Sequence, residues 1–223
     1  MNRYSPLFFN FIETAKKLQP KVVIAENVKG MLAGNAKGYV VEIGRKMKEA
    51  GYDVQLFCLN AATMGVPQKR ERVFFICHRS DLKLPKLQLK FSEKPITWGE
   101  IKDENSEGRK PLSSRDKMYI DTHNWINGRL QKLKTESKQV GGVGFYYMPR
   151  DRMVCSTVIS GARYVNHDKM ALWSTKEFCR AQSFPEDFDF IKSQPQYVIG
   201  MSVPQVMMAQ VAHQVYEQWL KTI

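Results

Sequence analysis

An α/β fold is predicted by the first 80 residues, in which two kinds of pattern alternate. Stretches with apolar residues at helical spacing are separated by short runs that are almost entirely apolar. Helices alternating with buried strands are typical of a sheet covered by helices. Of the 223 residues, 43% are hydrophobic and 25% are charged, so the chain has enough apolar mass for a folded core.

The elements of this first part follow from local signals along the chain. Ser5 and Pro6 suit the N-cap and first turn of a helix that Pro20 ends. Lys21–Ala25 is apolar after its first residue, which indicates a strand covered on both faces. The remaining elements are predicted as a helix over Lys37–Ala50, with Gly51 as its stop, and two strands over Val54–Leu59 and Val73–Cys77.

Regular patterning stops near residue 80 and returns near residue 154. Lys, Pro, Ser, Glu and Asn dominate the segment between, which predicts an irregular lobe. This lobe contains a basic stretch over Arg129–Lys138 and a glycine cluster at 141–144, interpreted as a hinge. Farther on, Ser174 and Glu177 form a capping box that starts a short helix. Pro204 opens the last helix, whose core-facing stripe is predicted as Met208, Val211, Val215 and Trp219.

The charge distribution favours a polyanionic partner. The chain has 34 Lys and Arg against 22 Asp and Glu, a formal net charge of +12. Residues 1–80 carry 13 basic and 6 acidic side chains, residues 81–150 carry 14 and 9, and residues 151–223 carry 7 and 7. A basic surface of this size is typical of nucleic-acid binding, although a merely soluble basic protein has the same composition.

The chain start and the cysteines indicate a cytoplasmic location and no metal site. The N-terminus lacks the features of a signal peptide, and no apolar run is long enough to cross a membrane, so no membrane partner is expected. The four cysteines show no CxxC pairing, which indicates reduced thiols and no structural zinc.

Two segments place polar side chains at structural junctions. Glu26 and Asn27 come directly after the first apolar run, where acids in α/β sheets are well placed to meet a ligand. In an extended chain Gln68, Arg70 and Arg72 would project from one face and present an amide and two guanidinium groups. Each segment also has a structural interpretation, as a helix cap or turn and as a charged edge strand.

Four segments, in this order, resemble the cytosine-C5 DNA methyltransferase family. Glu26-Asn27-Val28 is similar to its ENV motif, and 68–72 (QKRER) to its QxRxR motif. Residues 177–185 (EFCRAQSFP) look like its ExxRxQxFP motif, and 200–204 (GMSVP) look like GNSVP. The resemblance implies the rear half of a Rossmann-like methyltransferase sheet over 1–80 and a small target-recognition lobe over 81–153. Residues 154–223 would complete the lobe and return a C-terminal helix to the catalytic domain.

The sequence departs from the family at two motifs and one residue. The glycine-rich cofactor motif FxGxG and the nucleophile motif Pro-Cys-Gln are absent from these 223 residues. None of the four cysteines follows a proline, and Cys155 is interpreted as a packed thiol. Met201 stands where the family has asparagine, which removes a polar group from the expected cofactor edge.

The resemblance implies roles for individual residues. Glu26 would bind N3 of a flipped cytosine, Arg72 would bind its O2, and Arg70 would complete the catalytic set. The positioning residues would be Asn27, Gln68, Arg180 and Gln182, and the residues at the edge of an S-adenosylmethionine site would be Met201, Ser202 and Val203.

Three functional hypotheses remain open at this stage. The first is one subunit or fragment of a DNA (cytosine-5)-methyltransferase of a restriction-modification system, acting on double-stranded DNA by base flipping. It would need a second polypeptide carrying the FxGxG and Pro-Cys-Gln motifs, and would be inactive alone. The second is a truncated, inactive DNA-binding remnant, and the third is an RNA cytosine-C5 methyltransferase.

Overall fold

A computed structural model describes residues 6–105, 109–122, 124–126, 129–131 and 146–223. The chain forms two compact units. The first, called the sheet unit, comprises Met1–Asn60, Glu71–Lys90 and Val211–Ile223, and the second, called the lobe unit, comprises Ala61–Arg70 and Phe91–Gln210. The expected boundary at residue 80 therefore differs from the observed division, since 61–70 belongs to the lobe unit and the chain returns to the sheet unit at Val211.

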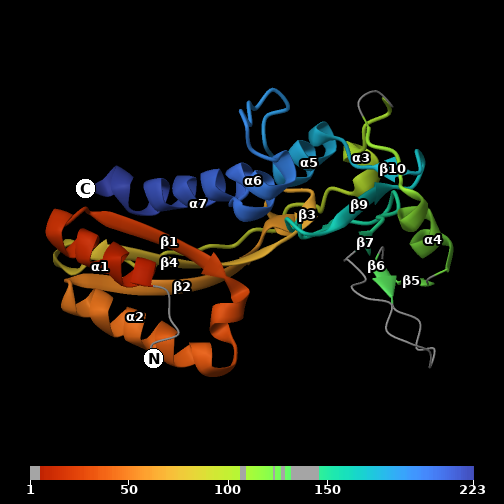
Figure 1. The fold of residues 1–223 in the computed structure, drawn as a ribbon. Helices are drawn as coiled ribbons and strands as arrows, with labels where there is room; N and C mark the ends of the chain where they lie inside the picture. Colours follow the sequence, from red (N-terminus) through yellow and green to blue (C-terminus); the bar gives the residue numbers. More distant parts are fainter. Residues whose placement is uncertain (1–5, 106–108, 123, 127–128, 132–145) are drawn as a thin grey trace. The chain divides into compact units, whose positions relative to one another are not determined.

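The sheet unit is built around three antiparallel strands in the order β1-β4-β2 (Figure 1). Its strands are β1 (Val22–Val28), β2 (Tyr52–Asn60) and β4 (Glu71–Arg79), and its helices are α1 (Pro6–Leu18), α2 (Lys37–Glu49) and the later part of α7 (Gln205–Gln218). Short 3₁₀ turns occupy Lys29–Leu32, Gly34–Ala36, Ser80–Leu82 and Leu220–Thr222. The two predicted helices of this unit and its three strands are confirmed.

Helices cover both faces of this sheet. On one face Phe8 and Ile12 of α1 and Met47 of α2 pack with Phe75 of β4 in a single core. On the other face Trp219, just after α7, meets His78 of β4 with ring centroids 4.8 Å apart. Strand β4 is consequently buried on both faces along most of its length.

Strand β1 differs from its prediction in two respects. It extends past Ala25 to Val28, because its pairing with β4 continues to the Val28–Arg72 register position. Glu26 and Asn27 therefore lie within the strand and not beyond it. Among the described residues β1 is also an edge strand whose residues are mostly half-buried, so the expectation of burial on both faces applies to β4 instead.

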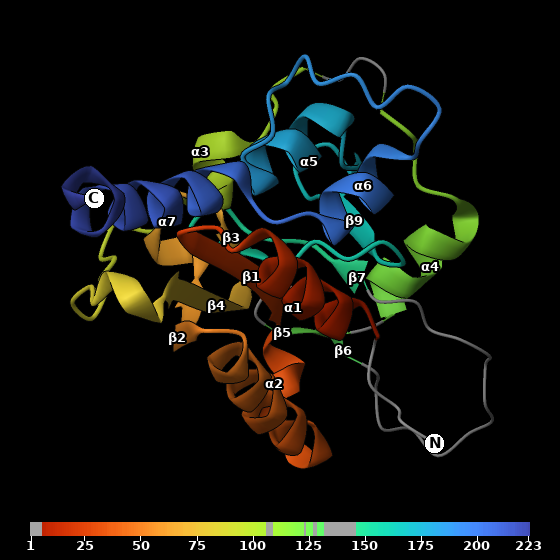
Figure 2. The same ribbon diagram turned by 90° about the vertical axis from the view of Figure 1, so that its left-hand side faces the viewer.

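The lobe unit contains a five-stranded sheet in the order β10-β9-β7-β6-β5 and a parallel pair, β3 and β8. Figure 2 shows α5 and α6 side by side above β9. The strands are β3 (Gln68–Lys69), β5 (Asn124–Ile126), β6 (Arg129–Gln131), β7 (Tyr146–Tyr147), β8 (Cys155–Ser156), β9 (Arg163–Asn166) and β10 (Ala171–Leu172). The helices are α3 (Trp98–Ile101), α4 (Ser114–Thr122), α5 (Thr175–Gln182) and α6 (Pro195–Met201), with a 3₁₀ turn at Ala61–Thr63.

An aromatic cluster forms the centre of the lobe unit. Trp98 and Trp173 stack with centroids 4.4 Å apart and an interplanar angle of 7°, and Tyr164 and Phe178 pack against Trp173. The sequence shows no strand pattern in this lobe and predicts irregular structure. The reason is that its strands have only two to four residues each and pair with segments distant in the chain. The glycine cluster at 141–144, interpreted as a hinge, and most of the basic stretch over 129–138 lie outside the described residues.

Two local predictions in the last 50 residues are tested by the structure. The capping box at Ser174 is confirmed, because the Ser174 and Glu177 side chains each accept from the other's backbone N–H. In α7 the buried stripe contains Val211, Val215 and Trp219, but it begins at Met207 and not at Met208. No helix of the described residues is long and apolar enough to span a bilayer.

Candidate functional site

Glu26 and Arg72 meet on one face of the sheet unit. Glu26 lies opposite Phe74 in the pairing of β1 with β4, and Arg72 lies opposite Val28, so the two residues are diagonal neighbours. Arg72 Nε is 2.7 Å from Glu26 Oε1. Their side chains are 13% and 26% exposed, so the pair is accessible yet largely shielded from water.

The Arg72 guanidinium is affected by both its burial and its acidic neighbour. Desolvation lowers the pKa of Arg72, and the neighbouring Glu26 carboxylate partly opposes that change. Arginine keeps its charge even so, because its ordinary pKa lies far above neutrality. The site therefore presents a permanent cation with forked donors next to a carboxylate.

An exposed ion pair that the sequence analysis missed lies beside this site. Lys29 Nζ is 2.7 and 2.8 Å from the two carboxylate oxygens of Glu71. This hydrogen bond raises the pKa of Lys29. It links the turn after β1 to the first residue of β4. The opposite charges of Lys29, directly after the ENV segment, and Glu71, within the QxRxR segment, are the sequence signal that could have indicated it.

Asn27 makes a local contact within β1. It lies opposite Val73, and its Oδ1 accepts from the backbone N–H of Val28 at 2.8 Å. Its expected role of holding a nucleophile loop stays a prediction.

The QxRxR segment is divided between the two units, which corrects the expectation of one shared face. Strand β3 ends at Lys69 and β4 begins at Glu71, so the segment is not one continuous strand. Gln68 and Arg70 belong to the lobe unit, whereas Arg72 belongs to the sheet unit.

Arg70 lies in a buried hydrogen-bond network, and its predicted place among the catalytic residues stays a prediction. Its side chain has no exposed surface, and its guanidinium donates to three backbone carbonyls. These acceptors are Val158 O at 3.1 Å, Gly200 O at 2.8 Å and Ser202 O at 2.8 Å. A guanidinium used in this way braces the protein and has little freedom to contact a substrate.

Gln68 and Gln182 extend the same buried network. Gln68 Nε2 donates to Gln182 Oε1 at 2.6 Å, and Gln68 Oε1 accepts from the backbone N–H of Val158 at 3.1 Å. Gln182 Nε2 donates to Ser202 O at 2.9 Å. The three motif segments 68–70, 177–182 and 200–202 are thus tied together by hydrogen bonds, and the positioning roles expected of both glutamines stay predictions.

Gly200 allows the backbone to approach closely at this network. A Cβ built at Gly200 would lie 3.2 Å from the backbone nitrogen of Ser160 and 3.4 Å from Val158 O. A larger residue would therefore push the 200–202 segment away from the Arg70 guanidinium.

Arg180 and Glu177 hold the short helix α5 against the lobe. Arg180 pairs with Glu186 at 2.6 Å and donates to Ile101 O at 3.2 Å. Glu177 is fully buried and forms a two-pronged ion pair with Arg109 at 2.6 and 2.9 Å, plus a hydrogen bond from Asn166 at 2.7 Å. In the sequence, Glu177 is only part of a capping box and a motif, and nothing local points to its ion pair, because its partner Arg109 is 68 residues away.

The residues expected at the edge of an S-adenosylmethionine site fit that role only in part. Met201 is 68% exposed, and Val203 is half-buried. Ser202 uses its carbonyl for Arg70 and Gln182, its hydroxyl for Val198 O and its backbone N–H for Ile199 O. This segment can therefore supply an apolar edge, but its polar atoms serve the internal network.

Three of the four cysteines are poor nucleophiles. Burial raises the pKa of Cys77 to about 12 and that of Cys179 to about 11, and it also raises the pKa of the fully buried Cys155 thiol. Cys58 is exposed on β2.

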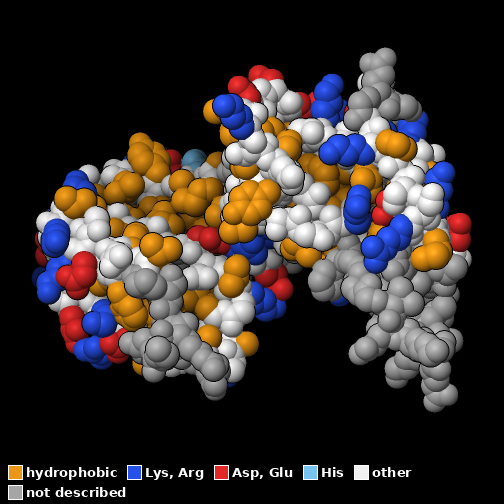
Figure 3. All heavy atoms as spheres, in the orientation of Figure 1, with side chains coloured by type: hydrophobic (Ala, Val, Ile, Leu, Met, Phe, Trp, Pro, Cys, Tyr) orange, Lys and Arg blue, Asp and Glu red, His pale blue; other side chains and the backbone are white. Residues whose placement is uncertain are grey.

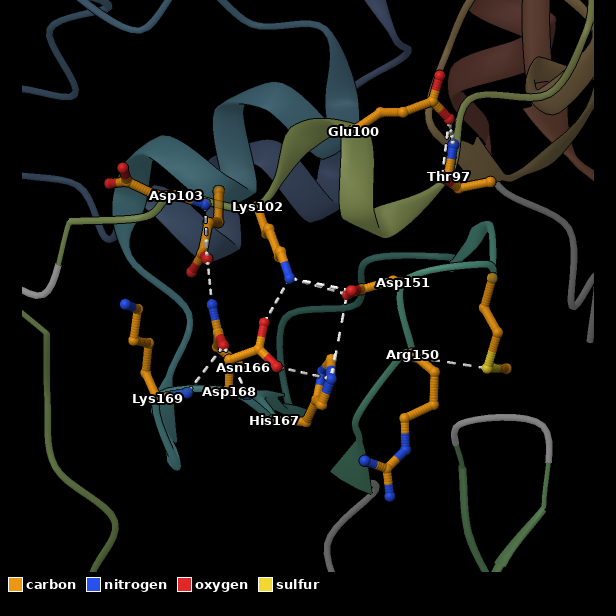
Figure 4. Close-up of polar contacts among 12 residues, drawn as sticks. Thr97, Glu100, Lys102, Asp103, Arg150, Asp151, Asn166, His167, Asp168 and Lys169 are labelled. Carbon is orange, nitrogen blue, oxygen red and sulfur yellow. Dashed lines mark hydrogen bonds and ion pairs between the residues drawn. The ribbon is translucent and has the colours of Figure 1, made fainter.

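One cluster of potential metal ligands lies in the lobe unit. Asp151, His167 and Asp168 each offer a ligand atom within 4.8 Å of the others. Figure 4 shows the Lys102 ammonium between the two carboxylates, and His167 Nε2 lies 2.8 Å from Asp168. Because the Lys102 ammonium already occupies the space between these two acids, we assign no metal to them.

The fold and the site together define a class of protein. The mixed α/β architecture is that of Rossmann-like methyltransferases. It matches a prophage-encoded protein of E. coli with a TM-score of 0.68 at 17% identity, over 95% of this chain and 73% of that one. It matches the Dnmt2 methyltransferase of S. pombe with a TM-score of 0.60 at 14% identity, over 94% and 71%.

The chain belongs to the C-5 cytosine-specific DNA methylase family, whose model matches residues 2–217. Members of this family use S-adenosylmethionine as methyl donor. The chain is 29% identical to the Type II methyltransferase M.NgoPII of Neisseria gonorrhoeae, over 89% of this chain and 65% of that protein. It is 40% identical to M.HhaI of Haemophilus parahaemolyticus, over 62% and 41%. The chain thus spans about two fifths to two thirds of the length of these relatives.

Proposed function

We propose that this chain carries the base-activating part of a DNA (cytosine-5)-methyltransferase site. In this proposal Glu26 hydrogen-bonds N3 of a flipped cytosine, and Arg72 binds O2. The contact that carries the proposal is the 2.7 Å pair between Arg72 Nε and Glu26 Oε1. It brings an acid and a forked cation to one accessible sheet face, where the two groups could bind N3 and O2 of the same base.

The chemistry explains why these two groups are needed. C5 of cytosine is a weak nucleophile until a thiolate adds to C6, and that addition places electron density on N3 and O2. A carboxyl group that is protonated in the complex and donates its hydrogen to N3, together with a guanidinium at O2, stabilises this charge as it develops. In the free protein each group is the other's partner, so both are already oriented before a base arrives.

The thiolate would come from outside this sequence, and we propose a second polypeptide as its source. Cys77, Cys155 and Cys179 are buried with raised pKa values, and none of the four cysteines lies in a Pro-Cys-Gln motif. The second polypeptide would also supply most of the S-adenosylmethionine site, with Met201, Ser202 and Val203 at one edge. S-adenosylmethionine provides the methyl group.

The surface of the sheet unit supports such a partner. Strand β1 has a sheet neighbour on one side only among the described residues, and an unpaired edge invites pairing with another chain. Large apolar side chains are exposed nearby, including Leu7 and Leu18 at 74% and Val28 at 53%. Figure 3 shows hydrophobic side chains interspersed with charged ones over this unit.

Reconstitution tests the proposal. The chain alone, the product of a neighbouring reading frame with FxGxG and Pro-Cys-Gln motifs, and their mixture are assayed for methyl transfer to duplex DNA. We expect activity only in the mixture, and equal activity of the chain alone would contradict the need for a partner. Absence of activity in every mixture would favour the inactive remnant, and transfer to RNA but not DNA would favour the RNA enzyme.

Substitution at Glu26 tests the site itself. In the reconstituted enzyme Glu26→Gln should lower the turnover rate by about 10²–10⁴-fold, as expected for loss of an acid–base group, and should change DNA affinity less than about twofold. The matched control is Glu49→Gln, at an exposed position on α2. Full turnover in the Glu26→Gln enzyme would rule out the assigned role.

DNA binding is assigned to the lobe unit as part of the same proposal. Arg150 is exposed, and Figure 4 shows it directed away from the Lys102 cluster. Arg129 is exposed on β6. Replacing either with Ala should weaken DNA binding and reduce its salt dependence, with turnover at saturating DNA retained. Because the matched relatives are named Type II methyltransferases, we place this activity in a restriction-modification system.

A further inference from the structure

The ion pair between Lys29 and Glu71 continues the register of β1 and β4 past the end of their ladder. The last paired residues of that ladder are Val28 and Arg72. Lys29 directly follows Val28, and Glu71 directly precedes Arg72, so the two charged residues stand at the next register position. Lys29 Nζ lies 2.7 and 2.8 Å from the two carboxylate oxygens of Glu71. This pair, called the clasp, therefore closes the end of the β1–β4 ladder directly beside Arg72.

The clasp lies on the opposite face of the sheet from the Glu26–Arg72 pair. Successive side chains of a strand point to opposite faces, so Glu71 and Arg72 of β4 face opposite ways. Lys29 binds the Glu71 carboxylate and is on the same side as that residue. The clasp therefore leaves the face of Glu26 and Arg72 open, and neither of its two side chains would contact a base bound there.

Glu71 also holds the Arg72 guanidinium through its backbone. Arg72 Nη1 donates to Glu71 O at 2.9 Å, while Arg72 Nε lies 2.7 Å from Glu26 Oε1. When a base takes up the Glu26 carboxyl, the Glu71 carbonyl is the contact that stays with the guanidinium. The direction of this carbonyl depends on the backbone of Glu71, which pairs with Asn60 of β2 on one side and is fixed by Lys29 on the other.

From these contacts we propose that Lys29 and Glu71 are positioning residues, which keep Arg72 in register with Glu26 during methyl transfer. This role rests on the proposed function of the Glu26–Arg72 pair. The end of a ladder opens more easily than its middle, because fewer contacts hold it. An exposed cross-strand pair of opposite charges shifts such an equilibrium by about fivefold at most. A shift of that size matters at a ladder end, where the open state is most accessible.

A competing role for Lys29 is contact with a DNA phosphate. The Lys29 and Glu71 side chains are 56% and 44% exposed, and an exposed ammonium suits a phosphate. The two roles differ in what they require of Glu71. A phosphate contact needs the lysine alone, whereas the clasp needs both charges and would tolerate their exchange.

The Nε proton of Arg72 reports on the clasp in the chain alone, by heteronuclear NMR. Its signal is identified by its loss in Arg72→Lys. Lys29→Met and Glu71→Gln should each speed exchange of this proton with water about two- to fivefold. The double reversal Lys29→Glu with Glu71→Lys should return the rate to within twofold. The matched control is Lys221→Met, which breaks the similarly exposed Lys221–Glu217 pair and should leave the rate unchanged.

Turnover of the reconstituted enzyme tests the consequence for catalysis. Lys29→Met and Glu71→Gln should each lower kcat at saturating DNA about two- to fivefold and leave KM for DNA within twofold, because a displaced catalytic group slows the chemical step more than binding. The double reversal should recover most of the lost kcat. Faster proton exchange with unchanged kcat would overturn the positioning role.

Two further results would overturn the proposal. One is exchange of the Arg72 proton that is no faster in Lys29→Met and Glu71→Gln than in Lys221→Met. The other is a raised KM in Lys29→Met alone, with Glu71→Gln unaffected, which would assign Lys29 to a phosphate. The NMR measurement does not involve methyl transfer. If Glu26→Gln kept full turnover while the clasp variants sped proton exchange, the proposed function would fail and the clasp around Arg72 would stand.

Discussion

Arg70 and Arg72 lie two residues apart in one motif, yet their side chains have different surroundings in the two units. Arg70, in the lobe unit, is fully buried and donates to three backbone carbonyls. Arg72, in the sheet unit, is partly exposed and faces a single carboxylate. A guanidinium that satisfies backbone carbonyls is part of the fold, whereas one that faces an exchangeable carboxylate can be transferred to a ligand. The surroundings of each arginine, and not its place in the motif, decide its role.

The largest expected effect lies in the lobe unit, at the buried Glu177–Arg109 pair. Glu177→Ala leaves the Arg109 cation buried without its carboxylate and should lower the free energy of unfolding by about 3–5 kcal/mol. Urea denaturation monitored by the fluorescence of the stacked tryptophans measures this change. A loss below about 1 kcal/mol would mean that the pair does not hold α5 in place.

Substitution of Arg70 should cause the next largest loss of stability. Arg70→Leu removes the Arg70 donor from three backbone carbonyls, of which Ser202 O keeps its bond from Gln182, and should cost about 2–4 kcal/mol of unfolding free energy. Arg70→Lys should recover little of this, because an ammonium cannot reach acceptors arranged for a planar fork. Full recovery by lysine would show that charge alone, and not the fork, is required.

Substitution of Arg72 should affect activity far more than stability, the reverse of what we expect for Arg70. Arg72→Ala removes a half-buried pair and should change the free energy of unfolding by about 1 kcal/mol or less. In the reconstituted enzyme the same change should lower turnover by about 10²–10³-fold. Measuring both quantities for Arg70→Leu and Arg72→Ala separates the two roles directly, and similar stability losses for both would remove the distinction.

The smallest effect concerns pH and Asp116 of the lobe unit. Burial alone would raise the pKa of Asp116, but hydrogen bonds from Ser113 and Tyr146 outweigh it and lower the pKa below its ordinary value. A lowered folded-state pKa contributes stability above the unfolded value of about 3.9, and this contribution is lost as pH falls through the folded value. Asp116→Asn should therefore show a shallower loss of stability below about pH 4 than the unchanged protein. Identical acid-denaturation curves would contradict this.

Local signals in the sequence predicted the elements of the sheet unit well. Periodicity, Pro6 and Gly51 gave two helices correctly, and the apolar runs gave three strands, because these signals act within a few residues. They did not reveal that β4 and not β1 is covered on both faces, since that depends on which strand lies in the middle of the sheet. They also missed the strands of the lobe unit, which are too short to show a period.

The sequence by itself determined which chemical groups this protein has and their order along the chain, including the acid at Glu26 and the arginines of the QxRxR segment. Only the tertiary structure decided which of them meet. Strand β3 ends at Lys69 and β4 begins at Glu71; the arginine between them enters a core of backbone carbonyls, and the next one reaches the carboxylate on β1. The physical reason is that a side chain's partners are set by strand pairing and burial across many residues, which no local spacing records.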